Sequence, residues 1–246
     1  MESKFKLPTE TVDLPSKGLF YPEDSPLAKG TIEMKYMTAK EEDILTNQNY
    51  IQKGIVIDKL LQSLIVTEKV DYSSLLSGDK NAIMIAARIL AYGKDYKVSI
   101  QGKEVVIDLS ELQNKEIDLS KIKRGENKFD FFSSVTENNL TFKLLTHKDE
   151  QLIEREITGL QKIDKDNITT STTRLKHLIT SINGLTEKKD IREFVDKYLL
   201  AKDARALRLE YSKVNPDVDL TVFPEGFEEG VDLPITLAFF WPDSRL

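Results

Sequence analysis

The chain has 246 residues with 35 basic and 41 acidic side chains, and its net charge is −6. All of that excess lies in residues 215–246, which hold seven acids, one base and five aromatic residues. The length allows one large or two small domains with a sizeable core. The lack of cysteine excludes disulfides and thiolate metal sites, and the pI near 5.2 disfavours nucleic-acid binding. No apolar run is long enough for a membrane span or a signal peptide, so neither is expected.

The N-terminal part begins with a segment, residues 1–30, that is rich in proline and glycine. Proline lacks an N–H donor and fixes φ, so we expect an extended, turn-rich arm. Residues 31–37 alternate as a strand does, and Thr38 with Glu41 forms a capping box. A short helix should therefore follow, ending near Leu45.

Two further helices are predicted before residue 93. The first carries a stripe at helical spacing, formed by Ile57, Leu60, Leu61, Leu64 and Ile65. The second should be capped by Asp79 and run to about Tyr92, where Gly93 ends it. It is apolar on nearly every face, which is typical of a helix at the centre of a core. Arg88 within it must extend to solvent or find an acidic partner.

The pattern then changes to strands and returns to helices. Two β-hairpins are predicted, the first pairing 96–100 with 104–107 and the second pairing 129–135 with 140–145. Thr146 and Asp149 form a second capping box, and three helices are expected after it. Their markers are a stripe of Leu175, Leu178, Ile179 and Ile182, a stripe of Ile191, Phe194, Val195, Tyr198 and Leu199, and a third helix over 203–214. Strand-like patterns follow at 218–223 and 231–237.

These elements predict an α+β fold: a mainly helical core of about six helices, with inserted β-hairpins and a β-rich C-terminal tail. We expect one integrated domain, divided into an extended arm (1–30), a first helical part (31–93), a β-hairpin insertion (94–145), a second helical part (146–214) and an acidic, aromatic tail (215–246).

Signatures of catalysis are weak in this sequence. His147 and His177 are far apart and have no partner at metal-ligand spacing, so each is interpreted as a surface or helix-cap histidine. Residues 76–80 lack the spacing of a phosphate-binding loop. Carboxylates cluster at 41–43, 149–150 and 228–229, but acid–base catalysis needs two of them in one cleft. The protein is therefore not expected to be an enzyme, and a carboxylate-based hydrolase is the weaker alternative.

Four stretches of the chain resemble one family. They are residues 14–21, residues 76–79 with 91–93, residues 144–150, and residues 203–208 with 216–219 and 239–242. In order and spacing these stretches are similar to the baseplate proteins of T-even-like contractile-tailed bacteriophages, in particular the baseplate hub assembly proteins. The resemblance implies a hub assembly factor or hub component that binds other hub or wedge proteins, in the host cytoplasm during assembly or in the virion baseplate.

The resemblance also leaves alternatives open. A transient tail-assembly chaperone absent from the virion is the runner-up, and a nucleic-acid adaptor is a further hypothesis. The family is expected to carry zinc knuckles, but this chain has residues 101–103 and 224–227 at those places, without cysteine. No zinc or other cofactor is therefore expected. Nucleic acid, a membrane and a small-molecule ligand are not expected as partners either.

Two segments are candidate partner contacts, because arms without their own core often order on a partner and aromatics dominate interface hot spots. Their residues are Leu14, Pro15, Gly18, Phe20, Tyr21, Phe239, Phe240, Trp241, Pro242 and Asp243. The equally weighted alternative is that both segments fold back on the chain's own helices. Asp203, Arg205 and Arg208 are expected to form intrahelical or tail-facing ion pairs.

Overall fold

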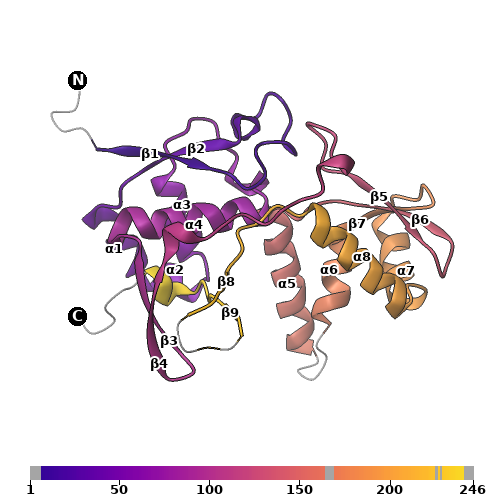
Figure 1. Cartoon of the computed structure of the whole chain (residues 1–246). Helices are drawn as coiled ribbons and strands as arrows, with labels where there is room; N and C mark the ends of the chain where they lie inside the picture. The colour runs from indigo at the N-terminus through magenta and orange to yellow at the C-terminus, as the bar shows by residue number, and fades with distance from the viewer. Residues whose placement is uncertain (1–6, 164–168, 225–226, 228, 241–246) are drawn as a thin grey trace.

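The computed structural model describes residues 7–163, 169–224, 227 and 229–240. These residues form an α+β fold of α-helices and small antiparallel sheets, as the sequence predicts. Figure 1 shows the first four helices beside the sheets β1–β2 and β3–β4, and the last four helices beside the sheet β5–β6–β7. The buried apolar side chains form one continuous cluster through both groups.

Eight α-helices lie within the described residues. They are α1 (Ala39–Leu45), α2 (Gln48–Gln52), α3 (Val56–Leu64), α4 (Ser77–Tyr92), α5 (His147–Ile163), α6 (Thr170–Leu178), α7 (Lys188–Lys197) and α8 (Ala201–Val214). Both predicted capping boxes are confirmed, since Glu41 accepts hydrogen bonds from Thr38 and Asp149 accepts them from Thr146. None of these helices is both long and apolar enough to cross a lipid bilayer.

The strands pair only with antiparallel neighbours. They are β1 (Thr9–Asp13), β2 (Thr31–Lys35), β3 (Asp95–Ile100), β4 (Lys103–Asp108), β5 (Phe129–Ser133), β6 (Asn138–Phe142), β7 (Ile179–Ile182), β8 (Thr221–Val222) and β9 (Val231–Asp232). Both predicted hairpins are confirmed as β3–β4 and β5–β6. The tail contains less β-strand than predicted. Strands β8 and β9 have two residues each, and residues 237–240 form a 3₁₀ turn.

The N-terminal segment corrects one prediction. It is not an arm without a core, because β1 pairs with β2 and the residues that follow are packed inside the molecule. Leu14 and Leu27 are 1% and 0% exposed. The prolines set the turns of this segment, but its apolar side chains decide where it lies, since burial of apolar surface is favourable.

Two helix boundaries also differ from the predictions. Helix α4 begins two residues before Asp79, with extended Leu76 as its N-cap, so Asp79 lies inside the first turn. Helix α6 ends at Leu178, and Ile179 and Ile182 belong to β7 instead of continuing the stripe. Strand β7 pairs with β6, and such a partner distant in sequence can override a local periodicity.

Helix α4 lies at the centre of the core, as its apolar composition predicts, and Ile83 is fully buried. Arg88 on this helix is 3% exposed, and no acidic partner is found for it within the described residues. Its guanidinium lies 5.0 Å and 5.7 Å from the ring centres of Tyr92 and Tyr96, and donates to the Gly93 carbonyl. Aromatic faces and a carbonyl therefore replace the expected carboxylate or solvent.

Candidate functional site

The first turn of α4 is a meeting point for distant parts of the chain. The backbone N–H of Ser16 donates to Asp79 Oδ1 at 2.9 Å, and the Tyr21 hydroxyl donates to Oδ2 at 2.5 Å. The same Tyr21 oxygen accepts the N–H of Leu76 at 2.9 Å. Asp79 and Ser16 are both 0% exposed. The N-terminal segment is therefore attached to α4 through a buried carboxylate, which the sequence alone suggested only as a helix cap.

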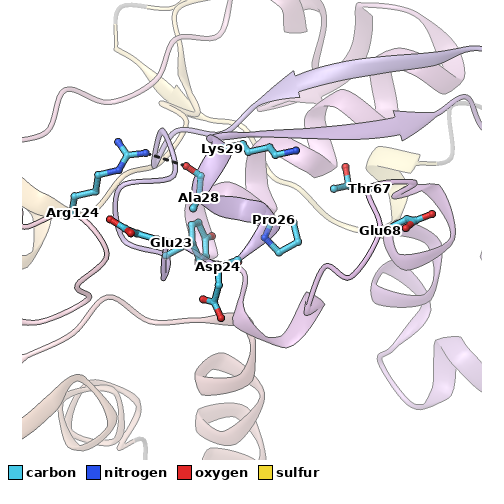
Figure 2. Close-up of a pocket in the computed structure, with 10 residues that line it drawn as sticks. Glu23, Asp24, Pro26, Ala28, Lys29, Thr67, Glu68 and Arg124 are labelled. Carbon is cyan, nitrogen blue, oxygen red and sulfur yellow. Dashed lines mark hydrogen bonds between the residues drawn. The ribbon is translucent and has the colours of Figure 1, made fainter.

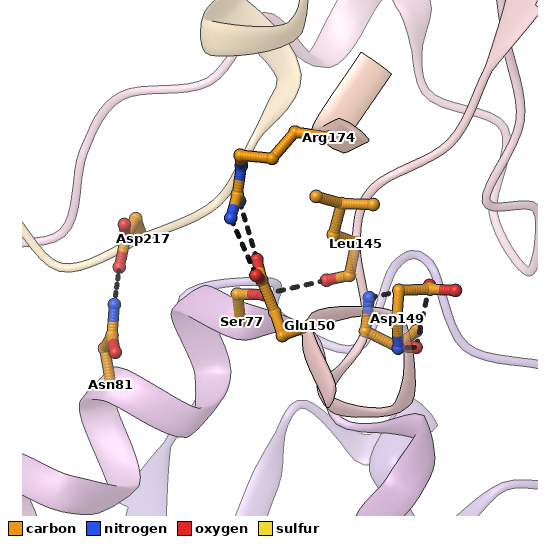
Figure 3. A network of polar contacts seen from close by, with 8 residues as sticks. Ser77, Asn81, Leu145, Asp149, Glu150, Arg174 and Asp217 are labelled. Carbon is orange, nitrogen blue, oxygen red and sulfur yellow. Dashed lines mark hydrogen bonds and ion pairs between the residues drawn. The ribbon is translucent and has the colours of Figure 1, made fainter. Parts of the chain in front are cut away.

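Two more segments reach the same turn. The backbone N–H of Ser77 donates to the Leu145 carbonyl at 3.1 Å, and the N–H of His147 donates to the Leu75 carbonyl at 2.7 Å. On the other side, Asn81 donates to Asp217 at 2.9 Å (Figure 3). Helix α4 is thus hydrogen-bonded at its N-terminus to the segment that begins α5 and to the segment that follows α8.

The pKa values of Asp79 and Tyr21, which meet at this turn, are both raised. Burial raises the pKa of Asp79, although the hydrogen bonds from Ser16 and Tyr21 oppose that rise. Burial and the neighbouring Asp79 also raise the pKa of the Tyr21 hydroxyl, so tyrosine is the proton donor of the pair. No cavity is lined by Asp79 among those found over the described residues. The arrangement therefore joins the N-terminal segment to α4, and Tyr21 also lines a hollow of about 720 Å³ together with Glu23 and Asp24.

Most of the predicted partner contacts are buried in the folded chain. Seven of the ten candidate residues are buried, namely Leu14, Pro15, Gly18, Phe20, Tyr21, Phe239 and Phe240. The Phe239 ring packs 4.9 Å from the Tyr96 ring, centre to centre. In the folded chain these side chains contact its own elements, which is the alternative that the sequence left open. Trp241, Pro242 and Asp243 lie outside the described residues.

The ion pairs predicted for Asp203, Arg205 and Arg208 on α8 are not found among the described residues. Asp203 is 1% exposed and accepts hydrogen bonds from the Val135 N–H and the Thr136 hydroxyl, so it orders the turn between β5 and β6. Arg208 contacts the Ser171 hydroxyl, and neither it nor Arg205 forms an ion pair within the described part of the chain. The expected intrahelical ion pairs are absent there because Asp203 faces inward.

A polar cluster that sequence reasoning missed lies between α3, α4 and α5. Asp58 Oδ1 accepts from Lys80 Nζ at 2.6 Å and from the Tyr72 hydroxyl at 3.0 Å. Its other oxygen lies 3.2 Å from His147 Nε2. His147, predicted to be a surface or helix-cap histidine, is the first residue of α5 but is only 6% exposed, so it does not lie on the surface. Its Nε2 is also 3.0 Å from Gln151 Nε2. Only the spacing of His147 and Gln151, one helical turn apart, was visible in the sequence.

The contact with Lys80 decides the role of one ring nitrogen of His147. Lys80 Nζ lies 3.2 Å from His147 Nδ1, and an ammonium group can only donate, so Nδ1 is the acceptor of that contact. Burial opposes the charge on Asp58, but hydrogen bonds from His147 and Lys80 outweigh it and hold the pKa of this carboxyl well below its usual range. The polar groups satisfy one another, so the cluster stabilises the helices.

Asp58→Asn is expected to destabilise the protein by about 2–3 kcal/mol at neutral pH, because Lys80 and His147 lose a partly buried anionic partner. The folded-state pKa of Asp58 is depressed, so its contribution is present above the unfolded pKa of about 3.9 and is lost as pH falls through the folded value. Urea unfolding should therefore show a smaller difference between variant and wild type near pH 3 than at pH 7. Asp130→Asn, at an exposed position on β5, is the control and should change little; a pH-independent difference for Asp58→Asn would contradict the assignment.

A hollow beside this cluster has a volume of about 920 Å³ and is lined by residues of α3, α4 and α5 and by Ile235 and Leu237 near the final 3₁₀ turn. A second hollow of about 720 Å³ is lined by Glu23, Asp24, Glu68 and Arg124 (Figure 2). Arg124 there donates to the Ala28 carbonyl. Within the described residues no group of three or more potential metal ligands comes together, at this hollow or elsewhere.

Of the predicted carboxylate clusters, those at 41–43 and 149–150 share none of the hollows described here, and Glu228 of the third cluster lies outside the described residues. Glu41 is paired with Lys35, Asp149 with Lys143, and Glu150 accepts two hydrogen bonds from Arg174 (Figure 3). Each of these three carboxylates therefore pairs with a basic residue from another part of the chain, and Glu41 and Asp149 also cap their own helices. The hydrolase alternative gains no supporting observation from them.

The chain was compared with protein-family models, curated proteins and solved structures. No family model, no curated protein and no solved structure matches it. The fold class therefore follows from the structure, and the function is inferred from the described residues and from the sequence resemblance.

Proposed function

We propose that this chain acts by protein–protein contact in the assembly of a phage tail baseplate, as a hub assembly factor or a hub component. One observation supports the proposal more than any other. Residues from all four stretches that resemble the baseplate family meet around the first turn of α4: Ser16 and Tyr21, Leu76 and Asp79, Leu145 and His147, and Asp217. Parts of the four stretches that are distant in the sequence therefore lie close together in the fold.

The chemistry of the described residues is compatible with a binding protein. The polar cluster around Asp58 and the junction around Asp79 are internally satisfied, and the clustered acids serve as caps and ion pairs. We infer no reaction from them. Partners would be other hub or wedge proteins, met in the host cytoplasm or in the baseplate.

The proposal predicts that the affinity-tagged chain, expressed during phage infection and cross-linked before lysis, will enrich baseplate hub or wedge proteins over an untagged control. Mass spectrometry of the captured proteins is the measurement. Failure to enrich any baseplate protein, while the tagged chain itself is recovered in folded form, would contradict the proposed function.

The same cultures separate the two versions of the proposal. If the chain is a hub component, mass spectrometry of purified virions should detect its peptides. Their absence from virions, together with their presence in infected-cell lysate, would favour the transient chaperone. The control is a known virion protein measured in the same two samples.

A further inference from the structure

A small apolar pocket with a basic rim lies where α6 and α8 meet the segment before α5. Its volume is about 210 Å³, and it is lined by Leu145, Ser171, Arg174, Leu175, Leu178, Arg208 and Tyr211. The three leucines are 5% exposed or less, so they form a closed hydrophobic floor. A hollow of this size holds one large apolar side chain.

The rim carries positive charge with one anionic neighbour. Arg174 is half exposed and is held in place by two hydrogen bonds to Glu150, at 2.8 Å and 2.7 Å. Arg208 is exposed, and its only hydrogen bond within the described residues is with the Ser171 hydroxyl at 3.4 Å. Arg205, one turn earlier on α8, is exposed and has no ion-pair partner in the same part of the chain. On the rim, the guanidinium of Arg208 is therefore available for an incoming carboxylate, and Arg205 lies outside the pocket lining one helical turn away.

We propose that this pocket docks an acidic peptide segment of a partner protein, with one leucine- or phenylalanine-sized side chain on the floor and a neighbouring Asp or Glu bound by Arg208. A guanidinium forms strong, charge-assisted hydrogen bonds with carboxylates, which a neutral segment could not offer. The inference deepens the proposed function and rests on it in one respect, namely that the partner is a protein.

Charge complementarity favours an acidic peptide over a nucleic acid. Phosphate backbones are bound by extended basic tracks, whereas here two arginines, Arg174 and Arg208, border an apolar floor on a chain of net charge −6. Burial raises the pKa of Tyr211 to about 12, so this residue presents a neutral phenol beside Arg208. The pocket thus combines one apolar contact with cationic contacts, as a short acidic motif requires.

The test uses a short fluorescein-labelled peptide in which phenylalanine is flanked by glutamates, with the full-length protein and fluorescence anisotropy as the readout. The serine-for-phenylalanine and lysine-for-glutamate versions are matched probes. We expect the first peptide to bind and both others to bind at least about tenfold more weakly. No binding of the first peptide, or equal binding of the serine version, would overturn the proposal.

Substitutions at two exposed residues of the pocket test the position of the site. Arg208→Glu should weaken binding at least about tenfold, because it replaces attraction by repulsion, and Ser171→Phe should do the same by filling the pocket mouth. Arg155→Glu makes the same charge change at an exposed residue of α5 that lines a different hollow, and should leave binding unchanged. Circular dichroism confirms that each variant is folded.

Several results would overturn the pocket assignment. These are wild-type affinity in Arg208→Glu, an equal loss in Arg155→Glu, or tighter binding of single-stranded DNA with a steep salt dependence. The capture experiment on infected cells keeps the two proposals distinguishable. If wild type and Arg208→Glu enrich the same baseplate proteins equally, the pocket is wrong and the proposed function stands. If the labelled peptide binds but wild type enriches none, the proposed function is wrong.

Discussion

Gly78→Ala is expected to destabilise the protein by about 3 kcal/mol or more, because there is no room for a methyl group at this position of α4. A Cβ there would lie 1.9 Å from the Pro216 carbonyl oxygen and 2.7 Å from the Asp217 Cα. Both obstacles are backbone atoms, so no side-chain rotation can relieve the overlap. The segment after α8 would have to move away from α4, and the hydrogen bond between Asn81 and Asp217 would be lost with it.

Chemical unfolding followed by circular dichroism measures this effect, and the chain supplies a matched control. Gly159 lies within α5, and nothing approaches its Cβ position within 4 Å. Gly159→Ala should therefore stabilise the protein by about 0.5–1 kcal/mol, through the higher helix propensity of alanine. If Gly78→Ala were as stable as wild type, the close packing of α4 against Pro216 would be incorrect.

Tyr21→Phe is expected to cost about 2–4 kcal/mol, since a single hydroxyl serves two buried groups. Its removal leaves Asp79 Oδ2 without its donor and the Leu76 N–H without its acceptor. Asp79 is fully buried, so water cannot replace the lost hydrogen bond without opening the junction. The loss should appear as a lower midpoint in urea unfolding.

The control for this substitution is Tyr36→Phe. The Tyr36 hydroxyl donates to Glu10 at 3.1 Å in an exposed hydrogen bond, so its removal should change stability by less than about 0.5 kcal/mol. Equal effects of the two substitutions would mean that the Tyr21 hydroxyl does not hold the N-terminal segment to α4. A larger effect for Tyr21 agrees with a junction whose polar groups depend on one another.

The junction also shows the structural role of two stretches singled out in the sequence. The stretches from 14 to 21 and from 144 to 150 supply backbone and side-chain partners to the first turn of α4. Their role in this chain is to join its parts, so they do not form an exposed surface for a partner. The search for the partner surface therefore moves to exposed residues such as Arg208, at the pocket between α6 and α8.

Local patterns predicted much of the secondary structure. The stripe of residues 57–65 predicted α3, and Thr38 with Glu41 predicted the start of α1, since both depend on neighbours within one or two helical turns. The hairpins β3–β4 and β5–β6 likewise pair segments that are close in sequence. The candidate site was predicted less well, because burial of Phe239 against Tyr96 depends on residues more than a hundred positions apart.

By itself, therefore, the sequence determined the fold class, the capping boxes, the hairpins and the central position of α4. Only the tertiary structure decided that Asp79 binds Tyr21 instead of capping a helix, that Ile179 and Ile182 form a strand, and that Asp58 and His147 meet. The physical reason is the range of the interactions. Helix periodicity and caps act over a few residues, whereas a buried carboxylate accepts hydrogen bonds from whichever donors the packed core brings to it.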